Sequence, residues 1–432
     1  MGRRYRGDVM DGAEVLRRQP FGDNPEVGLR GASTQRSILA AALGVFADEG
    51  FHDTNVELIS SAAGCSRPAF YQYFSSKEDV FWRLAGHLAR DLARLVEHLG
   101  DIEPDAGGLD SLERWLDQLV DVYFAYRPVF ISFQAAFRDH EPHQALPRTI
   151  TPLLVRSLES APRRRRVTPV DVDLETLADA TVAMILRSIH YWLFDLVPVP
   201  RPRFTAALAS TVHRVLFGAD PDVNIGRLAD PPSHEVPQWP EVVATTDEPA
   251  LRPRGRQTRQ DLLDAGGRVL PRRGFHDTRV DDIVAEAGCS HGSFYRYFEN
   301  KDVLFQVLAL DAGAAMARLA DAFPVEPRGV RPWLVDWFAT YRSNGGILSA
   351  WQEIGVEETV MTAMSLDLAA VFFDRLQRVV HARGFGDTTV DAVALLAVLE
   401  HVPYNVLVLG YLDEDQAVAA ADCIIRRGIF GA

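Results

Sequence analysis

Apolar residues recur at helical spacing from about residue 34 onward, and they define the first predicted element. Gly50 is expected to end this helix, because glycine readily adopts the left-handed conformation of a helix C-terminus. The sequence Thr54–Glu57 has the form of a capping box and predicts the start of a second, short helix. Ser66 can cap a third helix over residues 67–74. The apolar positions that share one face of the first helix are Ile38, Leu39, Ala41, Ala42, Val45 and Phe46.

Two short helices joined by a tight, glycine-containing turn behind a longer helix are typical of a helix-turn-helix unit. The sequence Ser75–Glu78 can then cap a fourth helix. Further helical patterns follow, and no segment alternates convincingly as a half-buried strand would, so an all-α fold is predicted. Each half of the chain closes with a long apolar helix and a final helix, expected over residues 173–197 and 204–217, then over 390–412 and 416–429.

The chain repeats itself: residues 34–84 and 258–308 align without a gap, at a constant offset of 224 (258 − 34). Gly-Phe-His-Asp-Thr, Ala-Gly-Cys-Ser and Phe-Tyr-x-Tyr-Phe-x-x-Lys occur once in each copy. An internal repeat of this kind indicates two copies of one structural unit. The predicted divisions are a flexible arm over 1–33, helix-turn-helix domains over 34–84 and 257–308, further helical domains over 85–218 and 309–432, and a proline-rich linker over 219–256.

The formal net charge of −14 argues against nonspecific binding to polyanions, but the charge is unevenly distributed. Residues 28–84 hold 5 basic and 6 acidic residues, a net charge of −1, whereas residues 252–308 hold 10 and 8, a net charge of +2. The second copy is therefore expected to contribute more of any electrostatic affinity for DNA.

Two long apolar stretches, residues 178–197 and 390–412, are expected to be buried helices, because charged residues interrupt both. The three cysteines form no CxxC pair and no disulfide framework, and residues 1–18 lack the apolar core of a signal peptide. A reducing, cytoplasmic location is expected. The run Asp139–His143 resembles a metal site only in composition, because Pro142 disrupts helical ligand spacing, so neither a metal nor another cofactor is expected.

The repeated motifs, Gly50 to Lys77 and Gly274 to Lys301, resemble the DNA-binding domain of the TetR family of bacterial repressors. A chain with two such domains resembles the tandem, single-chain TetR regulators of actinobacteria. The resemblance implies a DNA-binding transcriptional regulator, most simply a ligand-responsive repressor. It also implies an internal pseudo-dimer, to which pairing with a second chain can be added, and control of genes for lipid or sterol uptake or catabolism. A duplex operator and a small apolar effector, such as a lipid or an acyl-CoA, are the implied partners, and a membrane is not.

The chain contains two lysines, Lys77 and Lys301, and they occupy the same repeat position. Elsewhere the chain uses arginine, so this position is expected to require a compact ammonium group. Each lysine falls in the first turn of the fourth helix of its copy. A helix N-terminus together with an ammonium group forms a good phosphate site, which predicts a contact with the DNA backbone.

Base recognition would fall to the start of the third helix, whose side chains approach the major groove. The two copies differ at these positions, so the two half-sites are expected to differ and the operator to be an imperfect palindrome. Tyrosine hydroxyls can bond the sugar-phosphate backbone, although core packing is the alternative for any one of them. With the lysines above, the candidate DNA-binding residues are Arg67, Pro68, Ala69, Tyr71, Gln72 and Tyr73 in the first copy, and His291, Gly292, Ser293, Tyr295, Arg296 and Tyr297 in the second.

The resemblance also implies an apolar effector pocket between the helices of the regulatory halves. Core packing is the alternative role for each aromatic residue there. The candidate pocket residues are Tyr123, Tyr126, Phe130, His190, Trp192, Trp337, Tyr341, Trp351, His401 and Asn405.

Two other classes of function remain open. A ligand-sensing or scaffold protein that has lost DNA binding would suit the acidic charge balance. An enzyme is disfavoured, because the sequence has no nucleophile elbow, phosphate-binding loop or dinucleotide fingerprint.

Overall fold

The computed structural model consists of helices, turns and loops, with no strand among the residues it describes. Those residues are 29–99, 102–130, 151–152, 154–159, 172–194, 196, 198–224, 226, 251–352, 359–407, 410 and 412–432. The all-α prediction is confirmed.

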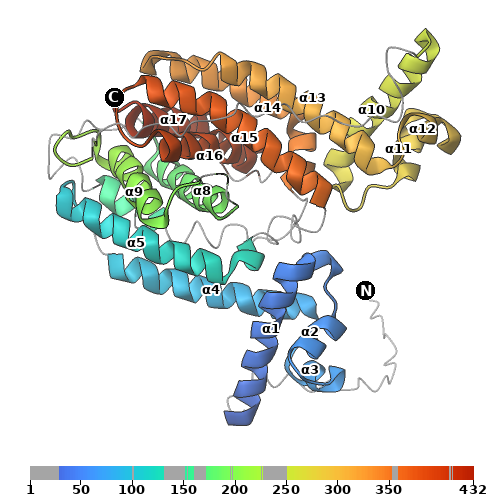
Figure 1. The fold of residues 1–432 in the computed structure, drawn as a ribbon, viewed down its shortest axis with the longest axis horizontal. Helices are drawn as coiled ribbons and strands as arrows, with labels where there is room; N and C mark the ends of the chain where they lie inside the picture. The colour runs from blue at the N-terminus through green and yellow to red at the C-terminus, as the bar shows by residue number, and fades with distance from the viewer. Residues whose placement is uncertain are drawn as a thin grey trace, which may run out of the picture.

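Each repeat folds into a three-helix unit, here called a head, followed by a long helix that leads into the body of the molecule (Figure 1). The first head comprises α1 (Leu29–Asp53), α2 (Val56–Ala62) and α3 (Arg67–Tyr73), and α4 (Lys77–Leu99) follows it. The second head comprises α10 (Pro253–Arg273), α11 (Val280–Ala287) and α12 (His291–Tyr297), and α13 (Lys301–Asp321) follows it.

The ends of the head helices follow from local sequence. Gly50 and Gly274 both have positive φ, 74° and 80°, where the first helix of each head gives way to a turn. The expected capping box at Thr54 is wrong, because the Thr54 hydroxyl donates to the Gly50 carbonyl. Asn55 caps α2 instead, accepting hydrogen bonds from the amides of Glu57 and Leu58, both at 3.0 Å.

The body is built from the helices that follow the heads. In the first half these are α4, α5 (Ala106–Ala125), α8 (Leu174–Leu193) and α9 (Arg201–Phe217). In the second half they are α13, the 3₁₀ turn η4 (Pro327–Gly329), α14 (Val330–Gln352), α15 (Thr359–Ala382), α16 (Thr388–Leu407), α17 (Glu414–Ile424) and the π-helical turn η5 (Ile425–Ile429).

The closing helices of the two halves pack against each other. Helix α8 lies against α16 and α17, and α9 lies against α16 and η5. Buried charges cross this interface: Arg214 of α9 donates to Asp391 of α16 at 3.0 Å and to the Gly428 carbonyl at 2.7 Å. Arg383 of the second half also donates to Asp391, so this buried carboxylate is shared by two guanidinium groups.

Helices α13 and α16 are long and apolar enough to cross a membrane by length and composition. Helix α16 is nevertheless the most enclosed helix of the body, since it packs against α8, α9, α14, α15 and α17. Its hydrophobicity is therefore accounted for by burial within the bundle.

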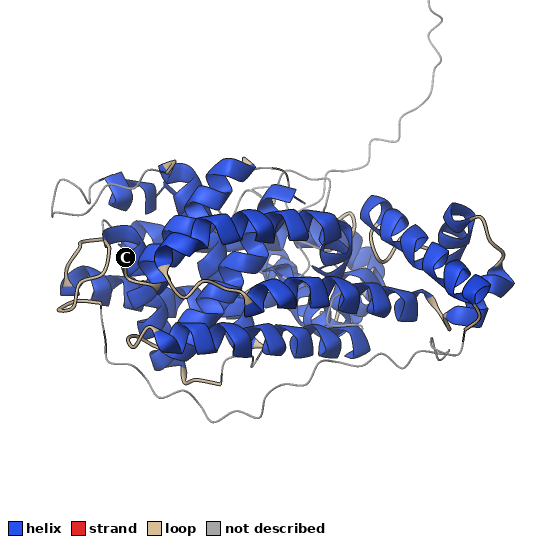
Figure 2. Ribbon diagram, turned by 90° about the horizontal axis from the view of Figure 1, so that it is seen from above, coloured by secondary structure: helices blue, strands red, loops and turns tan. Residues whose placement is uncertain are grey.

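Both heads lie at the end of the body away from the C-terminus (Figure 1), and the second head projects beyond the bundle when viewed from above (Figure 2). The core of the first head is continuous with that of the body. The second head has its own small core, and a separate apolar cluster joins it to α13 and α14. The members of that joining cluster are Leu270, Phe275, Phe305, Ala309, Ala312, Ile347 and Met364.

Candidate functional site

The candidate recognition helices, α3 and α12, are held in equivalent ways. Ser66 caps α3 by accepting from the Ala69 amide, and Ser290 caps α12 by accepting from the Ser293 amide, each at 3.3 Å. One phenylalanine in each helix is fully buried and fixes the orientation of the helix on its head. The predicted base-reading positions that remain exposed are Arg67, Pro68 and Gln72 on α3, and His291, Gly292 and Arg296 on α12, while Ala69 and Ser293 are half-buried.

The tyrosines of the two repeats divide into one exposed and one covered residue in each head. Tyr71 and Tyr295, at the same repeat position, are 49% and 56% exposed. Tyr73 is half-buried, and Tyr297 is buried in the core of the second head. The exposed pair can therefore meet a nucleic acid, whereas Tyr297 is a packing residue.

An acidic residue of the second helix pairs with the first residue of the recognition helix in both heads. The Arg67–Glu57 distance is 3.7 Å, and His291 lies 2.7 Å from Asp281. Glu57 belongs to the capping box expected at Thr54–Glu57, and Asp281 is its counterpart in the second repeat. The capping carboxylate of α11 is instead Asp282, which accepts from the Arg279 amide.

Lys77 and Lys301, which were predicted to contact the DNA backbone, direct their ammonium groups at protein carbonyls in this structure. Lys77 Nζ donates to the carbonyls of Phe51, His52 and Thr54 at 2.6, 2.8 and 2.8 Å, which uses all three of its N–H groups. Lys301 Nζ likewise donates to two equivalent carbonyls, at 2.8 and 3.3 Å. A planar guanidinium would not converge on three carbonyls in this way, which accounts for the choice of lysine.

The two heads contact each other at an equivalent position. The rings of His52 and His276 are stacked, with centroids 4.7 Å apart and an interplanar angle of 29°. Because Lys77 and Lys301 hold the carbonyls of these histidines, each lysine fixes the turn that carries the contact.

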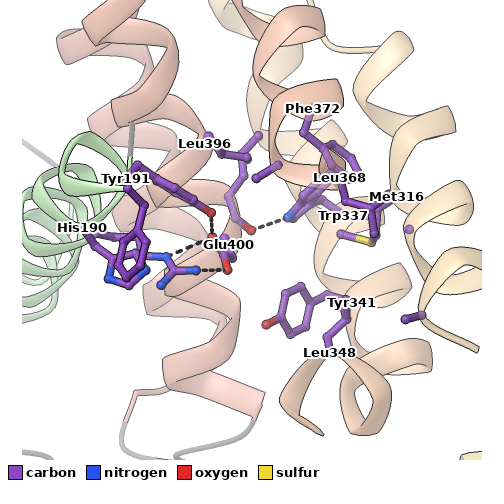
Figure 3. Close-up of a pocket in the computed structure, with 16 residues that line it drawn as sticks. His190, Tyr191, Met316, Trp337, Tyr341, Leu348, Leu368, Phe372, Leu396 and Glu400 are labelled. Carbon is purple, nitrogen blue, oxygen red and sulfur yellow. Dashed lines mark hydrogen bonds and ion pairs between the residues drawn. The ribbon is translucent and has the colours of Figure 1, made fainter. Parts of the chain in front are cut away.

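A cavity of about 150 Å³ lies where the two halves meet, not within one half as expected (Figure 3). Helix α8 of the first half contributes Arg187, His190, Tyr191 and Phe194 to its wall. Helices α13, α14, α15 and α16 of the second half contribute the rest. Of the predicted effector residues, the cavity is lined by His190, Trp337 and Tyr341.

A half-buried ion pair in the cavity wall joins one half to the other. Arg187 donates to both carboxylate oxygens of Glu400, at 2.5 and 3.1 Å, and the Tyr191 hydroxyl also donates to Glu400. Burial opposes ionisation of Glu400, but the charge of Arg187 and these hydrogen bonds outweigh it, so the pKa of the carboxyl is lowered. In the sequence, Arg187 interrupts one long apolar stretch and Glu400 interrupts the other. The opposite charges of these two residues are the sequence signal from which the ion pair could have been predicted.

Trp337 lines the cavity and also replaces a missing backbone hydrogen bond in α16. Pro403 lies inside α16 and has no N–H to donate to the Leu399 carbonyl, one turn earlier. The Trp337 indole N–H donates to that carbonyl instead, at 2.7 Å. The proline and the tryptophan therefore act as one structural unit.

Other predicted effector residues are engaged away from the cavity wall. Tyr123 bonds His190 at 3.2 Å and stacks on Phe130, while Tyr126 donates to Asp91 at 2.7 Å. The Trp192 indole donates to the Val199 carbonyl. Tyr123 therefore supports the cavity wall through His190, whereas Tyr126 and Trp192 are held by contacts elsewhere.

Two further predicted residues, His401 and Asn405, carry buried polar atoms that have no hydrogen-bond partner within the described part of the chain, but neither lines the cavity. Burial, followed by the charge of Arg187, lowers the pKa of His401 to about 4. Trp351 lies in α14, but its side chain is outside what the structure describes, as is the run 139–143. Among the described residues no acidic, histidine or cysteine cluster could hold a metal ion.

Comparison with known proteins identifies the repeated unit. Residues 38–84 and 262–308 each match the sequence model for "Bacterial regulatory proteins, tetR family". The repressor AcnR of Corynebacterium glutamicum is 29% identical over 171 residues, which cover 38% of this chain and 85% of AcnR. The regulator YdgC of Bacillus subtilis is 34% identical over 76 residues, which cover 18% of this chain and 39% of YdgC. A gamma-butyrolactone receptor structure matches with 22% identity and a TM-score of 0.33, covering 43% of this chain and 99% of the receptor.

Proposed function

We propose that this chain, which belongs to the TetR family and carries two of its DNA-binding domains, represses transcription as an intramolecular pseudo-dimer. The observation that carries the proposal is the pair of equivalent heads at one end of a shared body, each with an exposed recognition helix. Two heads in one chain can occupy two half-sites about one helical turn apart, roughly 34 Å. The cytoplasm is the compartment that this function requires.

The two recognition helices would read different half-sites. Arg67 and Gln72 of the first head are suited to guanine and adenine, whereas His291 and Arg296 of the second head offer a different set of donors. Tyr71 and Tyr295 would bond the sugar-phosphate backbone and fix register. Lys77 and Lys301 would act indirectly, by holding the turns behind the recognition helices.

An effector in the cavity would act chiefly on the second head. The cavity residues Ala309 and Leu348 belong to, or pack against, the apolar cluster that contains Leu270 and Phe275 of that head. At the same junction Gly346 of α14 lies close against Pro271 of α10. A ligand that shifts α14 would thereby shift α10 and change the separation of the heads, which is a two-state mechanism of release.

Selection from random duplex DNA followed by footprinting tests the function. We expect an imperfect inverted repeat that is protected over both half-sites. Arg296→Ala should relax base preference in the second half-site only, and Arg67→Ala in the first only. A perfect palindrome would contradict the unequal heads. Absence of sequence-specific binding at low salt would favour a ligand-sensing scaffold, and chromosomal footprinting would show whether lipid or sterol genes are controlled.

A further inference from the structure

The cavity contains one polar group for which the described part of the chain supplies no partner. Tyr341 is 2% exposed and lines the cavity, and its hydroxyl has no hydrogen-bond partner among the residues that the structure describes. In Figure 3 the Tyr341 hydroxyl points towards the side where Glu400 lies. A buried hydroxyl without a partner is costly, so a ligand that supplies one gains more here than at a surface site.

The charged groups of the cavity are already matched to each other. Arg187 and Glu400 form a two-point ion pair, so the lining carries no net charge from them. The pKa of His190 is lowered well below its ordinary value by burial and by the nearby Arg187 charge, which keeps its ring neutral. An ion entering this cavity would lose its hydration without gaining an uncommitted counter-charge, which excludes carboxylates and ammonium compounds.

The size of the cavity limits the ligand further. A volume of about 150 Å³ is that of cavities that take a single benzene-sized ring. The remaining wall is apolar and includes Met316, Leu368 and Phe372. A long acyl chain or a nucleotide would not fit within this volume and would have to extend outside it.

From these observations we propose that the cavity binds one small, uncharged, ring-sized molecule per chain, with a hydroxyl or carbonyl group bonded to Tyr341. This replaces the lipid or acyl-CoA expected from sequence with a more compact and neutral ligand class. The regulatory meaning of the site rests on the DNA-binding role proposed above, whereas ligand binding itself does not.

Calorimetric titration of the full chain with phenol, toluene, benzoate and benzylamine tests the assignment. We expect phenol to bind with a stoichiometry of one, toluene to bind about tenfold more weakly, and the two ions not to bind. Tyr341→Phe should reduce phenol affinity about tenfold, to the level of toluene, without changing toluene affinity. Tyr126→Phe is the matched control, since its hydroxyl bonds Asp91 away from the cavity, and it should leave both affinities unchanged.

Ala369→Leu, which fills the cavity without removing a polar group, should abolish binding of both phenol and toluene. Equal affinity for phenol and toluene, binding of benzoate, or no saturable binding by any probe would overturn the assignment. So would a Tyr341→Phe variant that keeps the preference for phenol. Binding of the selected operator is measured on the same preparation, so that failure of the ligand proposal can be told from failure of the DNA-binding proposal. If DNA binds normally while phenol does not, the proposed ligand class is wrong and the proposed regulatory function is unaffected.

Discussion

At the scale of single residues, the two lysines show where inference from sequence stops. Their unique occurrence at one repeat position indicated that the position needs an ammonium group, but not what that group contacts. The sequence could not show that the ammonium group turns back to carbonyls instead of outward, because that depends on the course of the Gly50–Thr54 turn. The equivalent position in the second head has two such bonds, so the role is shared but weaker there.

Replacing Lys77 with Met should therefore destabilise the first head. Three carbonyls would lose a charged donor, and we expect the free energy of unfolding to fall by about 2–3 kcal/mol, measured by denaturant titration. Lys301→Met should cost less. If Lys77 contacted a DNA phosphate instead, its replacement would leave stability unchanged and would reduce the salt dependence of DNA binding.

The acidic partners of the recognition helices lead to a second residue-scale prediction. Glu57→Gln removes a negative charge beside Arg67 and frees the guanidinium, so DNA binding should strengthen several-fold at low salt, an effect of about 1 kcal/mol. Fluorescence anisotropy with the selected operator measures it. Glu97→Gln, which removes a charge near the far end of α4, is the control, and an equal gain in that variant would rule out a local effect.

At the scale of elements, the helices were the most predictable part of the molecule. The helical spacing of apolar residues from Ile38 to Phe46 and the glycines at equivalent repeat positions predicted the head helices. The two long apolar stretches predicted α8 and α16. Helix starts were less predictable: α1 begins at Leu29, earlier than residue 34, and Asn55 displaced Thr54 as a cap. The cavity was not predictable, because its wall joins helices from both halves and depends on their crossing.

The junction of α14 with α10 allows a test of coupling between body and head. A Cβ atom added at Gly346 would lie 1.9 Å from Pro271 Cγ, so Gly346→Ala must push α10 away from α14. We expect a loss of about 1–3 kcal/mol in stability and weaker footprint protection of the second half-site, with the first half-site retained. Gly345→Ala is the adjacent control: nothing lies within 4 Å of its added Cβ, and it should be neutral or slightly stabilising. Equal effects of the two substitutions would argue against a packed junction.

At the scale of the whole molecule, the two halves are joined by buried polar groups as well as by apolar packing. Arg187–Glu400 and Arg214–Asp391 each pair one half with the other, and His52 and His276 join the heads. Breaking a buried pair by removing one partner is costly, so these contacts favour one relative placement of the halves. The repeat predicted two related units, but the residues that join them do not follow the repeat and could not be paired from sequence.

The half-buried His401 of α16 makes the stability of the whole molecule depend on pH. Its pKa is lowered by burial from 6.5 to about 4, so below pH 6.5 the unfolded chain takes up a proton that the folded chain does not. Stability should therefore fall as the pH drops from 6.5 towards 4, by up to about 3 kcal/mol from this residue. The lowered pKa of Glu400 acts with the same sign, but only below its unfolded value of 4.5. Denaturant titrations between pH 4.5 and 7.5 separate the two, and His401→Gln should flatten the profile in that range. A slope that persists unchanged in this variant would show that the proton is taken up elsewhere, with the similarly buried His190 as the next residue to replace.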